Sequence, residues 1–231
     1  DGQHAYDHDR YVHAGQSWLA HGWAVFHGWI AYHREIYHFH STLESSHPYL
    51  SRPAGWMLLV RPVAYFYASP SGCGKDACSQ EVLGVGTPAL WWAAIPAFIF
   101  TGWRWIARRD WRAAAMVLAF LAAYLPWFYA DHKHRTMFLF YLLPAVPFMA
   151  LMVAMTLGAA LGDGRQEVRR IIASVAIGAY LVVVVANFAW LRPVLSGDVI
   201  TYEQWHQRML FTNCDPAKHR NEHHENAPCW I

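Results

Sequence analysis

Hydrophobic and polar positions divide the chain into an aromatic, His-rich first part, a very apolar middle and a polar end. The middle holds four nearly uncharged stretches, each close to the roughly 20 residues that a helix needs to cross a bilayer. We therefore expect four membrane-spanning helices, at residues 88–106, 113–130, 137–160 and 171–191. Buried helices of a soluble protein would need a larger polar shell than this sequence provides.

The first part of the chain has a helical rather than a strand-like periodicity. Apolar residues recur at roughly helical spacing over residues 11–43, but many His residues interrupt them. This pattern favours an amphipathic helix that lies at the membrane surface instead of crossing it. Pro48, Pro53 and Pro62 then break the chain into turns and short pieces, and residues 69–80 are expected to form a loop.

The positive charges between the apolar stretches predict their orientation. Arg residues concentrate in the loops at residues 104–112 and 165–170, which the positive-inside rule places in the cytoplasm. Both ends of the chain and the loop at residues 131–135 then lie outside. We accordingly expect an outer segment with an amphipathic helix and a Cys loop (1–86), a four-helix membrane region (87–192) and an outer polar tail (193–231).

Composition narrows the class of protein. Apolar residues make up 55% of the sequence and charged residues only 15%, which favours a multi-pass protein of the cell membrane over a soluble one. The formal net charge is +2 and no basic tract is present, so we expect no nucleic-acid partner. The sequence begins without a Met or a signal-peptide pattern, and we expect it to be a fragment of a longer protein.

All four cysteines fall on the predicted outer side, where thiols oxidise readily. Cys73 and Cys78 precede the first apolar stretch, and Cys214 and Cys229 follow the last one. Four cysteines allow three pairings, of which two local bridges, Cys73–Cys78 and Cys214–Cys229, are the simplest. The cysteine positions thus agree with the predicted topology.

Metal and redox chemistry are alternative interpretations of the His and Cys residues. The tail could hold zinc through Cys214, His219, His223 or His224, and Cys229, but the spacing matches no standard zinc motif. We favour a disulfide there and expect no metal.

No His lies within the four apolar stretches, which argues against haem between helices. A thiol oxidase typically carries C-x-x-C, whereas the first pair here has four residues between its cysteines.

Cationic residues cluster in the segments expected at the outer interface. A membrane enzyme that handles a lipid-linked phosphate needs such cations at headgroup depth. Long cationic side chains also extend to the interface without any such role, so the pattern alone leaves both interpretations open. The residues concerned are His47, Arg52, Arg61, His132, Lys133, His134 and Arg135.

Several sequence blocks, in order, resemble one family. YHREIYHFHSTLESSHPYLSRPAGW, EVLGVGTPALWW, RTMFLFYLLPAVPF and NFAWLRPVLSG are similar to the C-terminal multi-span region of bacterial, and particularly actinobacterial, protein O-mannosyltransferases. The opening DGQHAYDHDR and the ending YEQWHQRMLF…WI fit as well. The resemblance implies an all-α membrane glycosyltransferase of the GT-C type, without a cofactor. Such an enzyme moves mannose from a polyprenyl phosphate to a Ser or Thr hydroxyl of a secreted protein.

The resemblance also implies roles for particular residues. The family's catalytic Asp-Glu pair lies in a first outer loop that no part of this chain matches, and Asp7 and Asp9 match a later segment. We therefore assign no catalytic residue and expect the fragment to be inactive alone. Arg52 or Arg135 would stabilise the departing lipid phosphate. The expected substrate and lipid-phosphate residues are His47, Tyr49, Ser51, Arg52, Arg61, Lys133 and Arg135.

The expected partners are a polyprenyl-phosphate mannose donor, a secreted acceptor protein with Ser or Thr, and the lipid bilayer of the plasma membrane. One alternative is a transferase of the same fold that modifies a glycolipid. A membrane thiol oxidase and a purely structural scaffold are alternatives from other classes. The polar stretch CDPAKHRNEHHENAPC near the end is longer than the family's usual ending, and its role stays open.

Overall fold

The structure, a computed structural model, describes residues 18–42, 47, 49–74, 76–133, 135–162, 167–211 and 230. The chain divides into two units, residues 1–45 and residues 46–231. The division that the sequence predicts, at residues 86 and 192, concerns sides of the membrane and stays a prediction.

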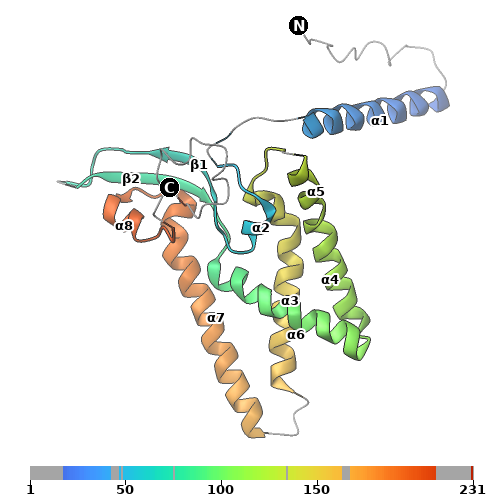
Figure 1. Ribbon diagram of the computed structural model, residues 1–231. Helices are drawn as coiled ribbons and strands as arrows, with labels where there is room; N and C mark the ends of the chain where they lie inside the picture. The colour runs from blue at the N-terminus through green and yellow to red at the C-terminus, as the bar shows by residue number, and fades with distance from the viewer. Residues whose placement is uncertain are drawn as a thin grey trace. The chain divides into compact units, whose positions relative to one another are not determined.

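Helix α1, Trp18–Thr42, is the described part of the first unit (Figure 1). Aromatic rings one turn apart contact each other along it: the ring centroids of Trp23 and His27 are 4.6 Å apart, and those of Trp29 and His33 are 4.2 Å apart. The helix that the sequence predicts is confirmed within these bounds, and its predicted flanks lie outside the described residues. Many of its aromatic side chains are exposed, which suits the membrane-surface location still predicted for it.

The second unit holds the long apolar helices (Figure 1). Its helices are α2 (Pro53–Trp56), α3 (Pro88–Arg108), α4 (Trp111–Tyr124), α5 (Pro126–His132), a 3₁₀ helix η2 (Leu139–Ala145), α6 (Val146–Leu161), α7 (Glu167–Ser196) and α8 (Tyr202–His206). Helix α5 continues α4, and α6 continues η2. The mainly helical fold class is therefore confirmed.

Three helical segments of the described chain are long and apolar enough to cross a membrane: residues 111–132, 139–161 and 167–196. Helix α3 has 21 residues, but its Trp residues and Arg104 make it less hydrophobic than the other three. In the view of Figure 1, α3 also runs obliquely to α4 and α6. Three of the four expected spans are confirmed as membrane-competent, and the span expected at residues 88–106, which contains most of α3, stays a prediction.

Local sequence sets the turn between α3 and α4. Arg109 adopts a left-handed backbone with φ of 50°, which reverses the chain after α3. Asp110 then caps α4, because its carboxylate accepts the backbone N–H of Arg112 at 3.1 Å. The guanidinium of Arg104 donates to the same carboxylate at 2.7 Å, and this hydrogen bond holds the pKa of Asp110 below its usual value.

Polar groups of α7 hold the start of α3. Asn187 accepts the backbone N–H of Ala89 at 3.0 Å, and the Tyr180 hydroxyl donates to the Ala89 carbonyl at 3.3 Å. The first N–H groups of a helix have no partner within the helix, so Asn187 satisfies a donor that would otherwise face an apolar environment.

A small antiparallel sheet lies beside these helices and was not expected from the sequence. Strand β1 (Val63–Ala68) pairs with β2 (Cys78–Gly84), which pairs with the short β3 (Ile200–Thr201). Residues 78–80, expected in a loop, thus belong to β2. Aromatic residues at three successive positions in β1 hide the alternation that marks a strand. A bulge between Ala64 and Phe66 shifts the pairing there.

Cys73 and Cys78 form a disulfide across the turn of the β1–β2 hairpin. This confirms the first predicted bridge. Cys214 and Cys229 lie outside the described residues, so the second bridge stays a prediction.

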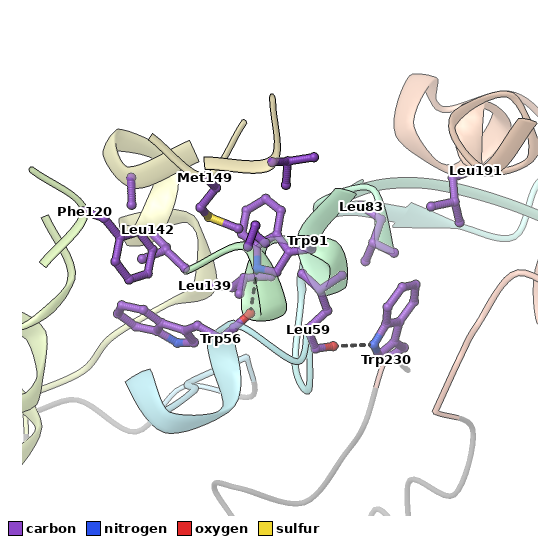
Figure 2. Packing of buried hydrophobic residues seen from close by; sticks show 14 of the residues in the cluster. Trp56, Leu59, Leu83, Trp91, Phe120, Leu139, Leu142, Met149, Leu191 and Trp230 are labelled. Carbon is purple, nitrogen blue, oxygen red and sulfur yellow. Dashed lines mark hydrogen bonds between the residues drawn. The ribbon is translucent and has the colours of Figure 1, made fainter. Parts of the chain in front are cut away.

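The core of the second unit forms where α2, α3, η2, α6 and residue 230 meet. Trp56, Leu59, Trp91, Met149 and Trp230 are all at most 5% exposed and belong to one cluster (Figure 2). This cluster joins the membrane helices to the segment that carries most of the predicted site residues.

Candidate functional site

The two cationic segments that the sequence singles out lie against each other. The backbone N–H of Ser51 donates to the carbonyl of Met137 at 2.9 Å. The ring centroids of His47 and Phe138 are 5.0 Å apart. The Tyr124 hydroxyl completes the junction by donating to the carbonyl of Pro53 at 2.6 Å. Residues far apart in the sequence therefore share one surface region.

A compact turn carries Arg52 at one end and Arg61 at the other. Pro53 starts α2 with the backbone angle that a first helical turn requires. Within the turn, the Gly55 N–H donates to the Arg52 carbonyl at 3.0 Å, and the Val60 N–H donates to the Gly55 carbonyl at 3.2 Å. The indole N–H of Trp56 donates back to Ser51 Oγ at 2.9 Å, so the buried serine hydroxyl is part of the turn's own bonding.

Arg52 is paired with an acidic residue of α5. Its Nε lies 3.8 Å from a carboxylate oxygen of Asp131, and the two side chains are 38% and 28% exposed. A pair this exposed contributes little stability, because water screens both charges. Its effect is to direct the guanidinium toward the end of α5.

Arg135 lies over two aromatic rings. Its guanidinium carbon is 5.7 Å from the Trp127 centroid and 5.6 Å from the Tyr141 centroid, both within cation–π range. These two rings stack on each other at 4.7 Å, and Trp56 lies 6.1 Å from Trp127. Neighbouring Lys133 is exposed, with its ammonium 5.8 Å from the centroid of Tyr129.

Tyr49, Arg61 and Glu81 form a more buried electrostatic group. Arg61 is 8% exposed and Glu81 only 3%. Burial raises the pKa of the Tyr49 hydroxyl, and the charge of Glu81 adds to this effect while Arg61 opposes it. Burial also raises the pKa of Glu81 to about 7, although the Trp205 indole N–H, which donates to its carboxylate at 2.6 Å, acts in the opposite direction.

The predicted site residues therefore fall into three groups. His47, Ser51, Arg52 and Arg135 come from the two segments that meet; Tyr49 and Arg61 belong to the buried group around Glu81. Exposed His132 ends α5 and exposed Lys133 follows it, and His134 lies outside the described residues. The assignment of substrate roles to these side chains stays a prediction.

Sequence inspection missed the groups that surround the cations. Asp131, Trp127 and Tyr141 contact Arg52 or Arg135, and Glu81 lies near Tyr49. Of these groups, only Asp131 could have been suspected from the sequence, because it directly precedes the cationic residues 132–135. Trp127 and Tyr141 look like ordinary membrane-interface aromatics in a sequence with 13 Trp and 12 Tyr.

Cations held by aromatic rings and backbone turns suit an anionic ligand at the membrane surface. Guanidinium groups pair well with phosphate oxygens, and a location at the ends of membrane helices matches the depth of a lipid phosphate. No group of three or more potential metal ligands occurs among the described residues. The guanidinium groups of Arg52 and Arg135 have the chemistry to pair with phosphate oxygens, and their assignment to a lipid phosphate stays a prediction.

Comparison with known proteins identifies the class to which this chain belongs, the protein O-mannosyltransferases. Residues 25–214 match the "C-terminal four TMM region of protein-O-mannosyltransferase", and the chain belongs to this family. The family resemblance drawn from the sequence blocks is confirmed.

Among curated proteins, the chain is 39% identical over 178 residues to a polyprenol-phosphate-mannose–protein mannosyltransferase of Mycobacterium tuberculosis, covering 74% of this chain and 34% of that protein. A protein of the same name from Corynebacterium glutamicum is 33% identical over 196 residues, covering 82% of this chain and 36% of that one. The chain thus spans about a third of the length of these relatives.

A solved structure shows the same fold. The S. cerevisiae protein O-mannosyltransferase Pmt1-Pmt2 complex bound to the sugar donor matches 88% of this chain and 28% of the compared chain, with a TM-score of 0.64 and 20% sequence identity. The overall fold of this chain is therefore shared with this distant structure.

Proposed function

We propose that the protein containing this chain transfers mannose from polyprenyl-phosphate mannose to Ser or Thr hydroxyls of secreted proteins at the outer face of the plasma membrane. The family membership and the names of the curated relatives support the donor and the protein acceptor. We further propose that the acceptor groups on the protein are the hydroxyls of Ser and Thr.

The reaction requires a site for a developing negative charge. The acceptor oxygen forms a bond to the anomeric carbon while the bond from that carbon to the phosphate oxygen breaks. The hydroxyl proton goes to a base, and polyprenyl phosphate leaves with the bonding electron pair. Cations placed at the leaving oxygen stabilise this charge more in the transition state than in the ground state. We assign that task to this chain and assign it no catalytic base.

Arg135 carries the proposal. Its guanidinium is held over Trp127 and Tyr141, and two residues further along the chain the Met137 carbonyl accepts from Ser51, the neighbour of Arg52. A planar cation fixed in this way can present its edge to two phosphate oxygens without losing much side-chain freedom on binding. Arg52 would then supply a second contact, and His47, Tyr49 and Ser51 would lie toward the sugar or the acceptor.

The test uses the complete protein in membranes with labelled polyprenyl-phosphate mannose and a Ser/Thr-rich peptide. We expect Arg52→Ala and Arg135→Ala to lower kcat/KM by about 10- to 100-fold, the loss typical of a hydrogen bond to a charged group. The matched control is Arg192→Ala, because Arg192 also pairs with an aspartate, Asp198, at 3.7 Å, but on exposed surface of α7 away from these residues.

The outcomes separate the family assignment from the site. If the parent transfers mannose and all three variants match it, the family activity stands and the cation site is wrong. If mannose appears in lipid but never in the peptide, the protein is a glycolipid transferase of the same fold.

A further inference from the structure

The turn from Trp56 to Val60 has a backbone that needs outside support. Leu59 has φ of 57°, the left-handed conformation that side chains with a Cβ disfavour, and it is 0% exposed. Its buried carbonyl also needs a hydrogen-bond donor, since water cannot reach it. A non-glycine residue persists in this conformation only where the surroundings hold it.

Two indoles from distant parts of the chain supply this support (Figure 2). Trp230, 2% exposed, donates its indole N–H to the Leu59 carbonyl at 2.7 Å. Trp91 of α3, 5% exposed, donates its indole N–H to the Trp56 carbonyl at 3.0 Å. Two buried side chains therefore hold the turn through hydrogen bonds, one to Trp56 where the turn begins and one to Leu59 near its end.

Trp56 connects this turn to the proposed phosphate cations. Its ring lies 6.1 Å from Trp127 and 6.4 Å from Tyr141, the two rings beneath Arg135. Its indole N–H holds Ser51, the residue before Arg52. A shift of the turn would therefore displace Arg52 directly and Arg135 through its aromatic support.

Trp230 is placed by the chain segment that follows α8. Its backbone N–H donates to the Phe211 carbonyl at 3.0 Å, and the ring centroids of the two residues are 6.4 Å apart. Phe211 therefore holds the backbone of Trp230 in place while the Trp230 indole donates to Leu59.

We propose that Trp91 and Trp230 are positioning residues for the lipid-phosphate donor: by holding the Trp56–Leu59 turn they set the geometry of Arg52 and Arg135. The inference rests on the proposed function, and it adds two side chains that touch no substrate. A purely structural role for the indoles would change the amount of folded protein, whereas a positioning role changes the affinity of each folded molecule for the donor.

The experiment replaces each indole by a ring without an N–H, in the complete protein. We expect Trp230→Phe and Trp91→Phe each to raise the KM for polyprenyl-phosphate mannose by about 3- to 10-fold, as expected for one lost buried hydrogen bond. KM does not depend on how much enzyme folds, so reduced yield alone cannot mimic the result. The control is Tyr180→Phe, which removes one donor to a backbone carbonyl, that of Ala89, at the α3–α7 contact.

A second measurement does not need turnover. Polyprenyl-phosphate mannose, or polyprenyl phosphate alone, should raise the melting temperature of the purified parent protein. We expect this rise to be smaller in both indole variants and unchanged in Tyr180→Phe.

An unchanged KM and an unchanged thermal shift in Trp230→Phe and Trp91→Phe would overturn the positioning role, and so would an equal change in the Tyr180→Phe control. A parent that binds polyprenyl phosphate but transfers no mannose overturns the proposed function, while the binding comparison still decides the positioning role.

Discussion

Glu81 is a residue of strand β2 that is only 3% exposed, and its carboxylate contacts Trp205 of α8. Its carboxylate accepts the Trp205 indole N–H, but burial dominates and raises the pKa to about 7 from an ordinary value of 4.5. The folded protein therefore binds a proton more tightly at this position than the unfolded chain does. The stabilisation from the neutral acid is fully present below pH 4.5 and is lost as pH rises through about 7.

We expect Glu81→Gln to remove this pH dependence. The parent should lose thermal stability between pH 5 and pH 8, at a slope of up to about 1.4 kcal/mol per pH unit for one proton. Glu81→Gln keeps an oxygen to accept from Trp205 and should be the more stable protein at pH 8. Melting curves in detergent across this range test the expectation, and parallel curves for the two proteins would contradict it.

Single-residue predictions from the sequence depend on local motifs. The cations of the HPYLSRP and DHKHR segments stand out because they lie in dense polar stretches between apolar ones, and their substrate roles stay a prediction. Their partners were not found, because Arg52 meets Asp131 and Trp56 meets Trp127 only after distant segments have folded together. No spacing rule along the chain contains that information.

Among the elements, the β1–β2 hairpin shows where pattern analysis failed, because no strand was predicted from the sequence. In β1, Val63 is buried and Ala64 is half-buried, and the three aromatic residues that follow are all exposed. Apolar and polar residues therefore do not alternate between the two faces of this strand. The Cys73–Cys78 bridge across its turn is the feature that the sequence did reveal, since cysteine spacing is visible without any strand assignment.

The double variant Cys73→Ser, Cys78→Ser tests what this bridge does. The disulfide closes only a short loop, so its removal should cost about 2 kcal/mol of stability or less. Melting curves measure that loss. We expect mannose transfer per folded molecule to stay within about twofold of the parent, because the bridge lies outside the proposed site. An activity that disappears with the two thiols and depends on an added oxidant would favour the thiol-oxidase alternative.

On the scale of the whole molecule, the helices confirm most of the predicted membrane pattern. The spans predicted at residues 113–130, 137–160 and 171–191 correspond to the apolar helical segments 111–132, 139–161 and 167–196, because long apolar runs need no tertiary information to be recognised. Helix α3 shows the limit of that method. Its length suits a span, but its Trp residues suit both lipid and a buried contact, and it packs among α4, α6 and α7.

Labelling from each side of the membrane tests the predicted orientation. Gln207→Cys, exposed on the part of the chain predicted to lie outside, should react with an impermeant maleimide in intact cells. Arg108→Cys, at the end of α3, should react only after permeabilisation, because the positive-inside rule places this Arg-rich region in the cytoplasm. The reverse pattern would invert the proposed topology and remove the site from the outer face.

The hydrogen bond between Phe211 and Trp230 has a consequence for how this protein can vary. Phe211 and Trp230 touch although they are 19 positions apart in the sequence. The free energy of bringing two such positions together rises only slightly with the number of residues between them. We therefore expect that a few residues inserted into the sequence between Phe211 and Trp230 would leave the contact of these two side chains, and the positioning of the Trp56–Leu59 turn by Trp230, unchanged.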